Sequence, residues 1–207
     1  AVLHAALKYD IDFVAAKARH SWDLLSEEDP VRAYATACLN KWQKEALGAA
    51  RSALKLPIWP LEPPQCIEYD LISANTVLRL EQYHRSCAAA AQALTLGTER
   101  ISWGHALTTE QCEHCGGTSL TAARHQLALT SWMNKYLSAI ADEFASRPAP
   151  STAFDKNVVE STIREAYEGQ RPCELHFHTM EAINRFVKHF ARKVEVVLCD
   201  VDLILEF

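Results

Sequence analysis

Apolar residues recur at steps of three and four along most of this chain, and this spacing constrains its fold more than any other feature. The clearest run extends from about 179 to 198 and places five apolar residues on one helical face: Ile183, Phe186, Phe190, Val194 and Val197. No alternation of strand and helix patterns accompanies it, which argues against an α/β sheet. The sequence therefore predicts a mainly α protein, a multi-helix bundle.

Short polar residues mark where several of these helices begin. Asp29 before Pro30 is a start signal, and the helix that follows is expected to break near Asn40. Ser73 and Asp155 are expected to cap later helices, because their side-chain oxygens can accept hydrogen bonds from free amides of a first turn. The segments between these signals are long enough for stable helices.

A long helix is expected from about 120 to 145, with a break at 147–152 where the sequence reads "RPAPST". Its candidate core residues follow helical spacing: Leu127, Trp132, Tyr136, Ile140 and Phe144. After the last helix, the apolar and acidic residues of 200–206 alternate, which favours an extended or edge-strand tail.

Four prolines between 57 and 64, in "PIWPLEPP", exclude regular structure there. The sequence thus divides into a helical unit at 1–56, a long proline-rich linker or loop at 57–72, and a second helical unit at 73–207. The N-terminus lacks both an initiator Met and the pattern of a secretory signal, so we expect a fragment of a longer, non-secreted protein.

Composition excludes several partners. Hydrophobic residues make up 49% of the chain and charged residues 23%, as in ordinary globular proteins. A net charge of −5 with no basic run predicts no nucleic-acid surface, and the apolar stretches are too short to span a membrane. Seven cysteines at irregular spacing, without a secretion signal, favour a reducing compartment, the cytoplasm or nucleus.

The stretch "QCEHCGG" at 111–117 carries the most specific chemistry. Cys112 and Cys115 are separated by two residues, a spacing at which one turn can aim two thiolates at one ion. A redox dithiol is the alternative, but that motif usually sits at a strand-to-helix junction, which is not expected here. Isolated buried thiols are the other competitor.

The second half of a metal site is expected at Cys173 and His176, which repeat the two-residue spacing just before the last helix. The helices at 120–145 and 155–168 would form an antiparallel pair and bring the two loops together. Zinc prefers four such ligands in a tetrahedron, so we predict a structural Zn site that staples the C-terminal helical unit. His178 is an alternative fourth ligand, and His105 and His114 are weaker candidates.

No nucleophile elbow, phosphate-binding loop or HExxH motif occurs, so no enzymatic activity is predicted. Five scattered histidines are expected at the surface or at the edge of the core: His4, His20, His84, His125 and His189.

Two N-terminal segments, "VLHAALKYDID" and "DPVRAYATACLNKWQKEALGAARSALKLPI", resemble the BACK-like helices that follow the core of BTB/POZ proteins. The likeness is greatest to the large group of such proteins in mushroom-forming fungi. There a segment like "ISANTVLRLEQYHRSCAAAA" (72–91) follows, then a Trp and a CxxC, here Trp103 and Cys112/Cys115. A second cysteine pair tends to precede the last helix, where this chain has Cys173 and His176.

The resemblance implies a protein–protein interaction or adaptor module. The BTB core would precede residue 1 and would mediate homodimerisation. The alternative function is a thiol- or metal-dependent enzyme or redox sensor that uses Cys112 and Cys115.

Overall fold

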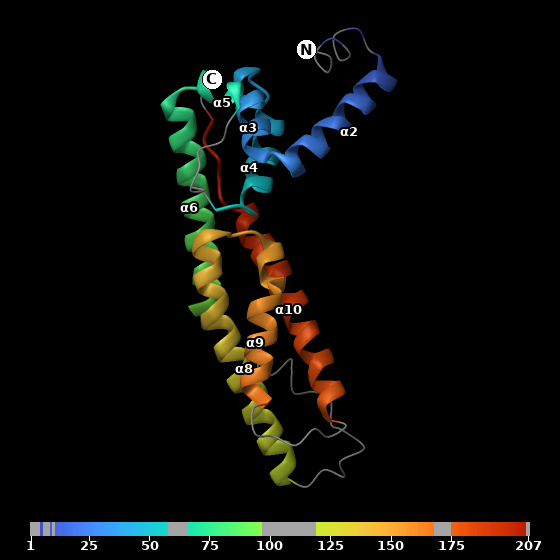
Figure 1. Ribbon diagram of the computed structural model, residues 1–207, viewed down its shortest axis with the longest axis vertical. Coiled ribbons are helices and arrows are strands. Elements are labelled where there is room, and N and C mark those ends of the chain that lie inside the picture. Colours follow the sequence, from blue (N-terminus) through green and yellow to red (C-terminus); the bar gives the residue numbers. More distant parts are fainter. Residues whose placement is uncertain are drawn as a thin grey trace. The chain divides into compact units, whose positions relative to one another are not determined.

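The computed structural model describes residues 5, 9, 11–57, 66–96, 119–167 and 175–205, with some helical residues described by their backbone alone. The helices of this part are α2 (Asp12–Glu28), α3 (Pro30–Leu39), α4 (Gln43–Ala53), α5 (Ile67–Leu71), α6 (Ala74–Leu96), α8 (Ser119–Ser146), the 3₁₀ helix η2 (Pro150–Phe154), α9 (Lys156–Tyr167) and α10 (Leu175–Cys199) (Figure 1). No strand occurs among the described residues, so the prediction of a mainly α fold is confirmed.

The chain divides into two compact units. The first comprises Ala1–His84 with Asp202–Phe207, and the second comprises Arg85–Val201. This division differs from the expected linker at 57–72, because α5 lies within that range and packs against α3 in the first unit. An ion pair between Arg32 Nη2 and Glu68 Oε1, 3.0 Å apart, joins the two helices. Residues 58–65, half of the expected proline-rich loop, lie outside the described residues.

Alanine makes up much of the buried surface of α3 and α4 in the first unit. The fully or nearly buried alanines are Ala33, Ala35 and Ala37 of α3 and Ala46, Ala49, Ala50 and Ala53 of α4. Because a methyl group is the whole side chain, the two helices can approach closely with little loss of side-chain entropy. As the sequence predicted, Asp29 caps α3 through its Oδ1, 3.1 Å from the Arg32 amide, and α3 ends before Asn40. Lys41 then adopts a left-handed φ of 60°.

Two buried polar side chains fix the start of α6 within the first unit. Tyr34 donates its hydroxyl to the carbonyl of Thr76 at 3.0 Å. His84 is only 2% exposed, and its Nε2 lies 3.1 Å from the carbonyl oxygen of Leu56. Burial lowers the pKa of His84 although this hydrogen bond opposes the shift. His84 is therefore a core residue, and its expected place at the surface or core edge is corrected.

Aromatic packing joins α8 to α10 in the second unit. The ring centroids of Trp132 and Phe186 are 5.7 Å apart, and those of Tyr136 and Phe190 are 6.0 Å apart, both edge to face. The step of four residues from Trp132 to Tyr136 along α8 is matched by the step from Phe186 to Phe190 along α10, so the two helices run in the same direction. Figure 1 shows them side by side with α9. We call these contacts the aromatic seam.

The predicted core of these helices is confirmed where side chains are described. The buried members are Trp132, Tyr136, Ile140 and Phe144 of α8 and Ile183, Phe186, Phe190 and Val194 of α10. The backbone alone is described at Leu127, and Val197 is partly buried. Beyond α10, residues 201–205 form no strand; the expected strand-like tail is irregular in this described part.

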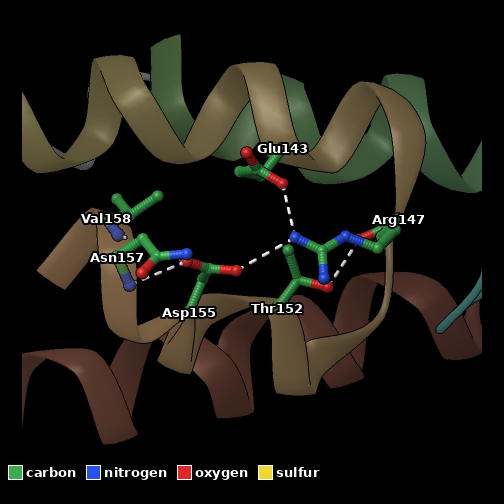
Figure 2. A network of polar contacts seen from close by, with 6 residues as sticks. All are labelled: Glu143, Arg147, Thr152, Asp155, Asn157 and Val158. Atoms are coloured by element: carbon green, nitrogen blue, oxygen red, sulfur yellow. Dashed lines mark hydrogen bonds and ion pairs between the residues drawn. The ribbon is translucent and has the colours of Figure 1, made fainter.

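A polar network closes the corner between α8 and α9. Figure 2 shows the Arg147 guanidinium between the carboxylates of Glu143 and Asp155, and its Nη2 lies 3.0 Å from Asp155 Oδ2. Thr152 donates to the carbonyl of Arg147 at 2.7 Å. The break expected at 147–152 is thus partly the ordered 3₁₀ turn of η2, which returns the chain into α9.

Asp155 also caps α9, as its sequence position predicted. Its Oδ1 accepts hydrogen bonds from the amides of Asn157 at 3.0 Å and Val158 at 3.2 Å (Figure 2). Burial opposes ionisation of this carboxyl, but the hydrogen bonds from Arg147 and from the two amides outweigh it, so the pKa of Asp155 is lowered. The ionised carboxylate therefore stabilises the corner.

We expect Phe190→Ala to lower the free energy of unfolding of the second unit by about 3–5 kcal/mol, because it removes a fully buried ring from the aromatic seam. Val196→Ala on the same helix is the control: Val196 is 61% exposed, and a change within about 0.5 kcal/mol is expected. Urea denaturation measures both. Equal losses in the two variants would contradict the seam.

We expect Asp155→Ala to cost about 1–2 kcal/mol at neutral pH, since the cap and the partner of Arg147 are lost together. A carboxyl whose pKa is lowered by folding stabilises above its unfolded pKa of about 3.9, and this contribution is lost as pH falls through the folded value. The deficit of the variant should therefore shrink below about pH 4. Asp142→Ala, an exposed change on α8, is the control and should leave stability unchanged at each pH. A deficit that stays constant down to pH 2 would contradict this prediction.

Candidate functional site

The predicted metal ligands fall mostly outside the described residues. This is so for Cys112, Cys115 and Cys173, and also for the weaker candidates His105 and His114. His176 and the alternative His178 lie in the first turn of α10, where only the backbone is described. The zinc site therefore stays a prediction.

The described helices nevertheless constrain where these segments attach. The aromatic seam makes α8 and α10 parallel, so their first residues, Ser119 and Leu175, lie at the same end of the second unit (Figure 1). Cys115 precedes Ser119 by four residues in the sequence, and Cys173 precedes Leu175 by two. An extended chain spans at most about 3.5 Å per residue, so four residues cover at most about 14 Å and two residues at most about 7 Å.

The other four cysteines, all among the described residues, form no disulfide: Cys38, Cys66, Cys87 and Cys199. Burial raises the pKa of Cys38 and of Cys66, which disfavours the reactive thiolate. Within the described part of the chain, no three His, Cys, Asp or Glu side chains are grouped to hold a metal ion.

A polar groove of about 430 Å³ lies between α2 and α4 of the first unit. Helix α2 contributes Trp22, Asp23, Ser26 and Glu27 to its walls, and α4 contributes Lys44 and Glu45. This volume falls within the range of small-ligand pockets, about 300–1,000 Å³. The sequence did not predict the groove, because its walls come from two separate helices and no motif in either helix indicates it.

Gly48 keeps the wall of the groove open. It lies inside α4, where glycine costs stability relative to alanine, and a Cβ built on it would meet no atom within 4 Å. No tight packing therefore requires a glycine there. A glycine in a helix otherwise rich in buried alanine is the one sequence signal that could have revealed the groove.

Ser26 lies in the wall of the groove, and its hydroxyl is buried and unpaired. The residue is 8% exposed, and its buried Oγ has no hydrogen-bond partner. Ser21, one and a half turns earlier, instead donates to the carbonyl of Lys17 at 3.1 Å. A buried hydroxyl without a hydrogen-bond partner lowers stability by about 1–3 kcal/mol. The hydroxyl of Ser26 therefore does not stabilise the fold.

The charged residues of the groove are unevenly paired. Glu27 forms an ion pair with Lys55, with Nζ and Oε1 3.1 Å apart. Asp23 and Glu45 form no ion pair with any described residue. Trp22 packs edge to face against Trp42, with ring centroids 5.7 Å apart, and this contact fixes α2 near the start of α4.

No family model, curated protein or solved structure matches this chain. Among the described helices, none is long and apolar enough to cross a membrane.

We expect Gly48→Ala to raise the free energy of unfolding by about 0.5–1 kcal/mol, because the added methyl enters open space and improves helix propensity. Ala50→Gly in the same helix is the matched control and should lower stability by about 1 kcal/mol or more, since Ala50 is fully buried. Thermal and urea denaturation measure both. A destabilising Gly48→Ala change would show that the wall is not open.

Proposed function

We propose that this chain is a non-enzymatic protein–protein interaction module, the region that follows a BTB/POZ core, and that a structural zinc ion stabilises its C-terminal unit. Cys112, Cys115, Cys173 and His176 are the proposed ligands. The observation that carries the zinc proposal is the parallel seam, which puts the starts of α8 and α10 at one end of the unit.

The donor set suits zinc and a structural role. Three thiolates and one imidazole complete a tetrahedron, with bonds of about 2.3 Å to sulfur and 2.0–2.1 Å to nitrogen. A closed tetrahedron leaves no coordination position for water or substrate, so the ion would hold two chain segments together. His176 would reach the ion from the first turn of α10, adjoining Cys173.

The interaction role rests on the sequence resemblance and on the helices found in the same segments. Helices α3 and α4 cover most of "DPVRAYATACLNKWQKEALGAARSALKLPI", and α6 covers most of "ISANTVLRLEQYHRSCAAAA". These are the segments in which the BTB/POZ family is expected to be helical. The proposal assigns the partner-binding role to this helical scaffold.

We expect Cys112→Ser and Cys173→Ser each to lower the melting temperature by at least about 5 °C, because loss of the metal removes folding free energy. A strong chelator should lower the melting temperature of the unaltered chain similarly and release one zinc per chain. Cys199→Ser is the control, since Cys199 is an exposed free thiol, and it should melt as the unaltered chain does.

Unchanged melting of both cysteine variants and of the chelated chain would contradict the zinc site. A metal-free chain in which Cys112 and Cys115 form a reversible disulfide would instead favour the redox-sensor alternative.

A further inference from the structure

We propose that the exposed side of helix α10 is a docking surface for an acidic segment of a partner protein. Its basic residues are Lys188, His189 and Arg192, which we call the basic face. The inference names a partner chemistry for the interaction module and rests on that proposed function. The basic face belongs to the second unit and includes none of the proposed zinc ligands.

Helical spacing gathers these residues on one side of α10. All three side chains are exposed, and Arg185, one turn earlier, is exposed on the same side. The rings of the aromatic seam lie on the other side of the helix and are buried. The chain carries a net charge of −5, yet residues 184–194 include four Arg or Lys and no Asp or Glu. This side of α10 therefore has the opposite sign to the chain as a whole.

The fold does not use the charges of the basic face. Lys188 and Arg192 form no ion pair with any described residue, although Glu195 lies only three residues beyond Arg192. Lys188 and Arg192 are four residues apart, a spacing at which like charges destabilise a helix. The last turn of α10 contains no basic residue, so these cations are too far from the C-terminus to offset the helix dipole. The charges thus lower stability without an intramolecular partner.

Charge and an exposed valine together define the occupant. Carboxylates form strong hydrogen bonds with lysine and arginine, and successive cations on this side of α10 are one turn, about 6 Å, apart. Val196 follows Arg192 by one turn on the same side and is 61% exposed. Alternate residues of an extended peptide lie about 6.6 Å apart on one side. An acidic segment with alternating carboxylates that ends in an apolar residue therefore matches the surface.

A short protein segment fits this surface better than a nucleic acid or a membrane. A nucleic-acid duplex carries one charge for about every 1.7 Å of its length and would extend beyond the basic face, where the net charge of −5 repels phosphates. A helix that binds in a lipid interface inserts an apolar side. The apolar side of α10 is already buried in the core of the second unit.

The test is an NMR titration of the full 207-residue chain with the peptide acetyl-(Glu-Ser)3-Leu-amide at pH 7. The amide signals of Lys188, Arg192 and Val196 are expected to shift and saturate. Raising NaCl from about 20 to about 200 mM should weaken binding about fivefold, because salt screens exposed charges. The same peptide with Gln in place of Glu should cause no saturable shift. No saturation with the acidic peptide, or equal shifts with both peptides, would overturn the inference.

Charge variants separate binding from folding. Lys188→Gln and Arg192→Gln should each weaken binding about threefold or more, and the double variant about tenfold. Both changes remove a like-charge repulsion, so stability should stay the same or rise. Lys17→Gln, an exposed change on α2, is the matched control and should leave binding unchanged. Equal weakening by Lys17→Gln would mean a diffuse attraction and would overturn the surface.

Val196→Ala tests the apolar end of the surface. This exposed change should weaken the peptide that ends in Leu about twofold or more, because the apolar contact is reduced. A peptide that ends in Ser should bind the variant and the unaltered chain equally. Equal binding of the Leu peptide to both chains would overturn the part assigned to Val196.

Two further titrations test the class of partner. A thymidine tetranucleotide carries the same three negative charges as the peptide, and vesicles of equal parts phosphatidylserine and phosphatidylcholine present anionic lipid. Tighter binding of either than of the peptide would overturn the assignment to a protein segment.

The inference and the proposed function can fail separately. A partner protein that binds the unaltered chain and the double variant equally would support the interaction module and overturn the basic face. Loss of peptide binding only when zinc is removed would keep both proposals, whereas failure of the titration in a chain that retains its zinc counts against the basic face alone.

Discussion

The packing of aromatic rings between α8 and α10 is the contact on which the second unit depends. Trp132 and Tyr136 meet Phe186 and Phe190 at matched steps, and this match makes the two helices parallel. Parallel helices require a return segment between them, which η2 and α9 supply and which the Arg147 network holds at its corner. The same geometry puts two helix starts, each preceded by cysteine in the sequence, at one end of the unit. The proposed zinc site follows from this register.

The first unit is built on a different principle. Alanine makes up much of the buried surface of α3 and α4, and one ring contact, that of Trp22 with Trp42, joins α2 to the start of α4. One turn of α4 departs from this pattern at Gly48, where there is open space and no packing need for glycine. The groove beside it is lined in part by Ser26, whose buried hydroxyl has no hydrogen-bond partner and therefore costs stability.

Local chemistry explains which features the sequence predicted. Asp29, Ser73 and Asp155 act through amides a few residues away, so their capping was predictable, and Ser73 Oγ indeed lies 3.2 Å from the Thr76 amide. Features that depend on contacts between residues far apart in the sequence were not predicted. An ion pair between Arg32 and Glu68 joins helix α5 to α3. The buried ring of His84 forms a hydrogen bond with the carbonyl oxygen of Leu56. The groove needs α2 and α4 together, and no spacing within either helix predicts it.

X-ray absorption at the zinc edge of the purified chain is the most direct test of the proposed zinc site. Because the register of α8 and α10 puts both helix starts at one end of the second unit, the proposed site predicts a spectrum of one zinc with three sulfurs near 2.3 Å and one nitrogen near 2.0–2.1 Å. A chain that binds no zinc, or a spectrum with only two sulfurs and with water oxygens in the remaining positions, would contradict a site shared by the two segments.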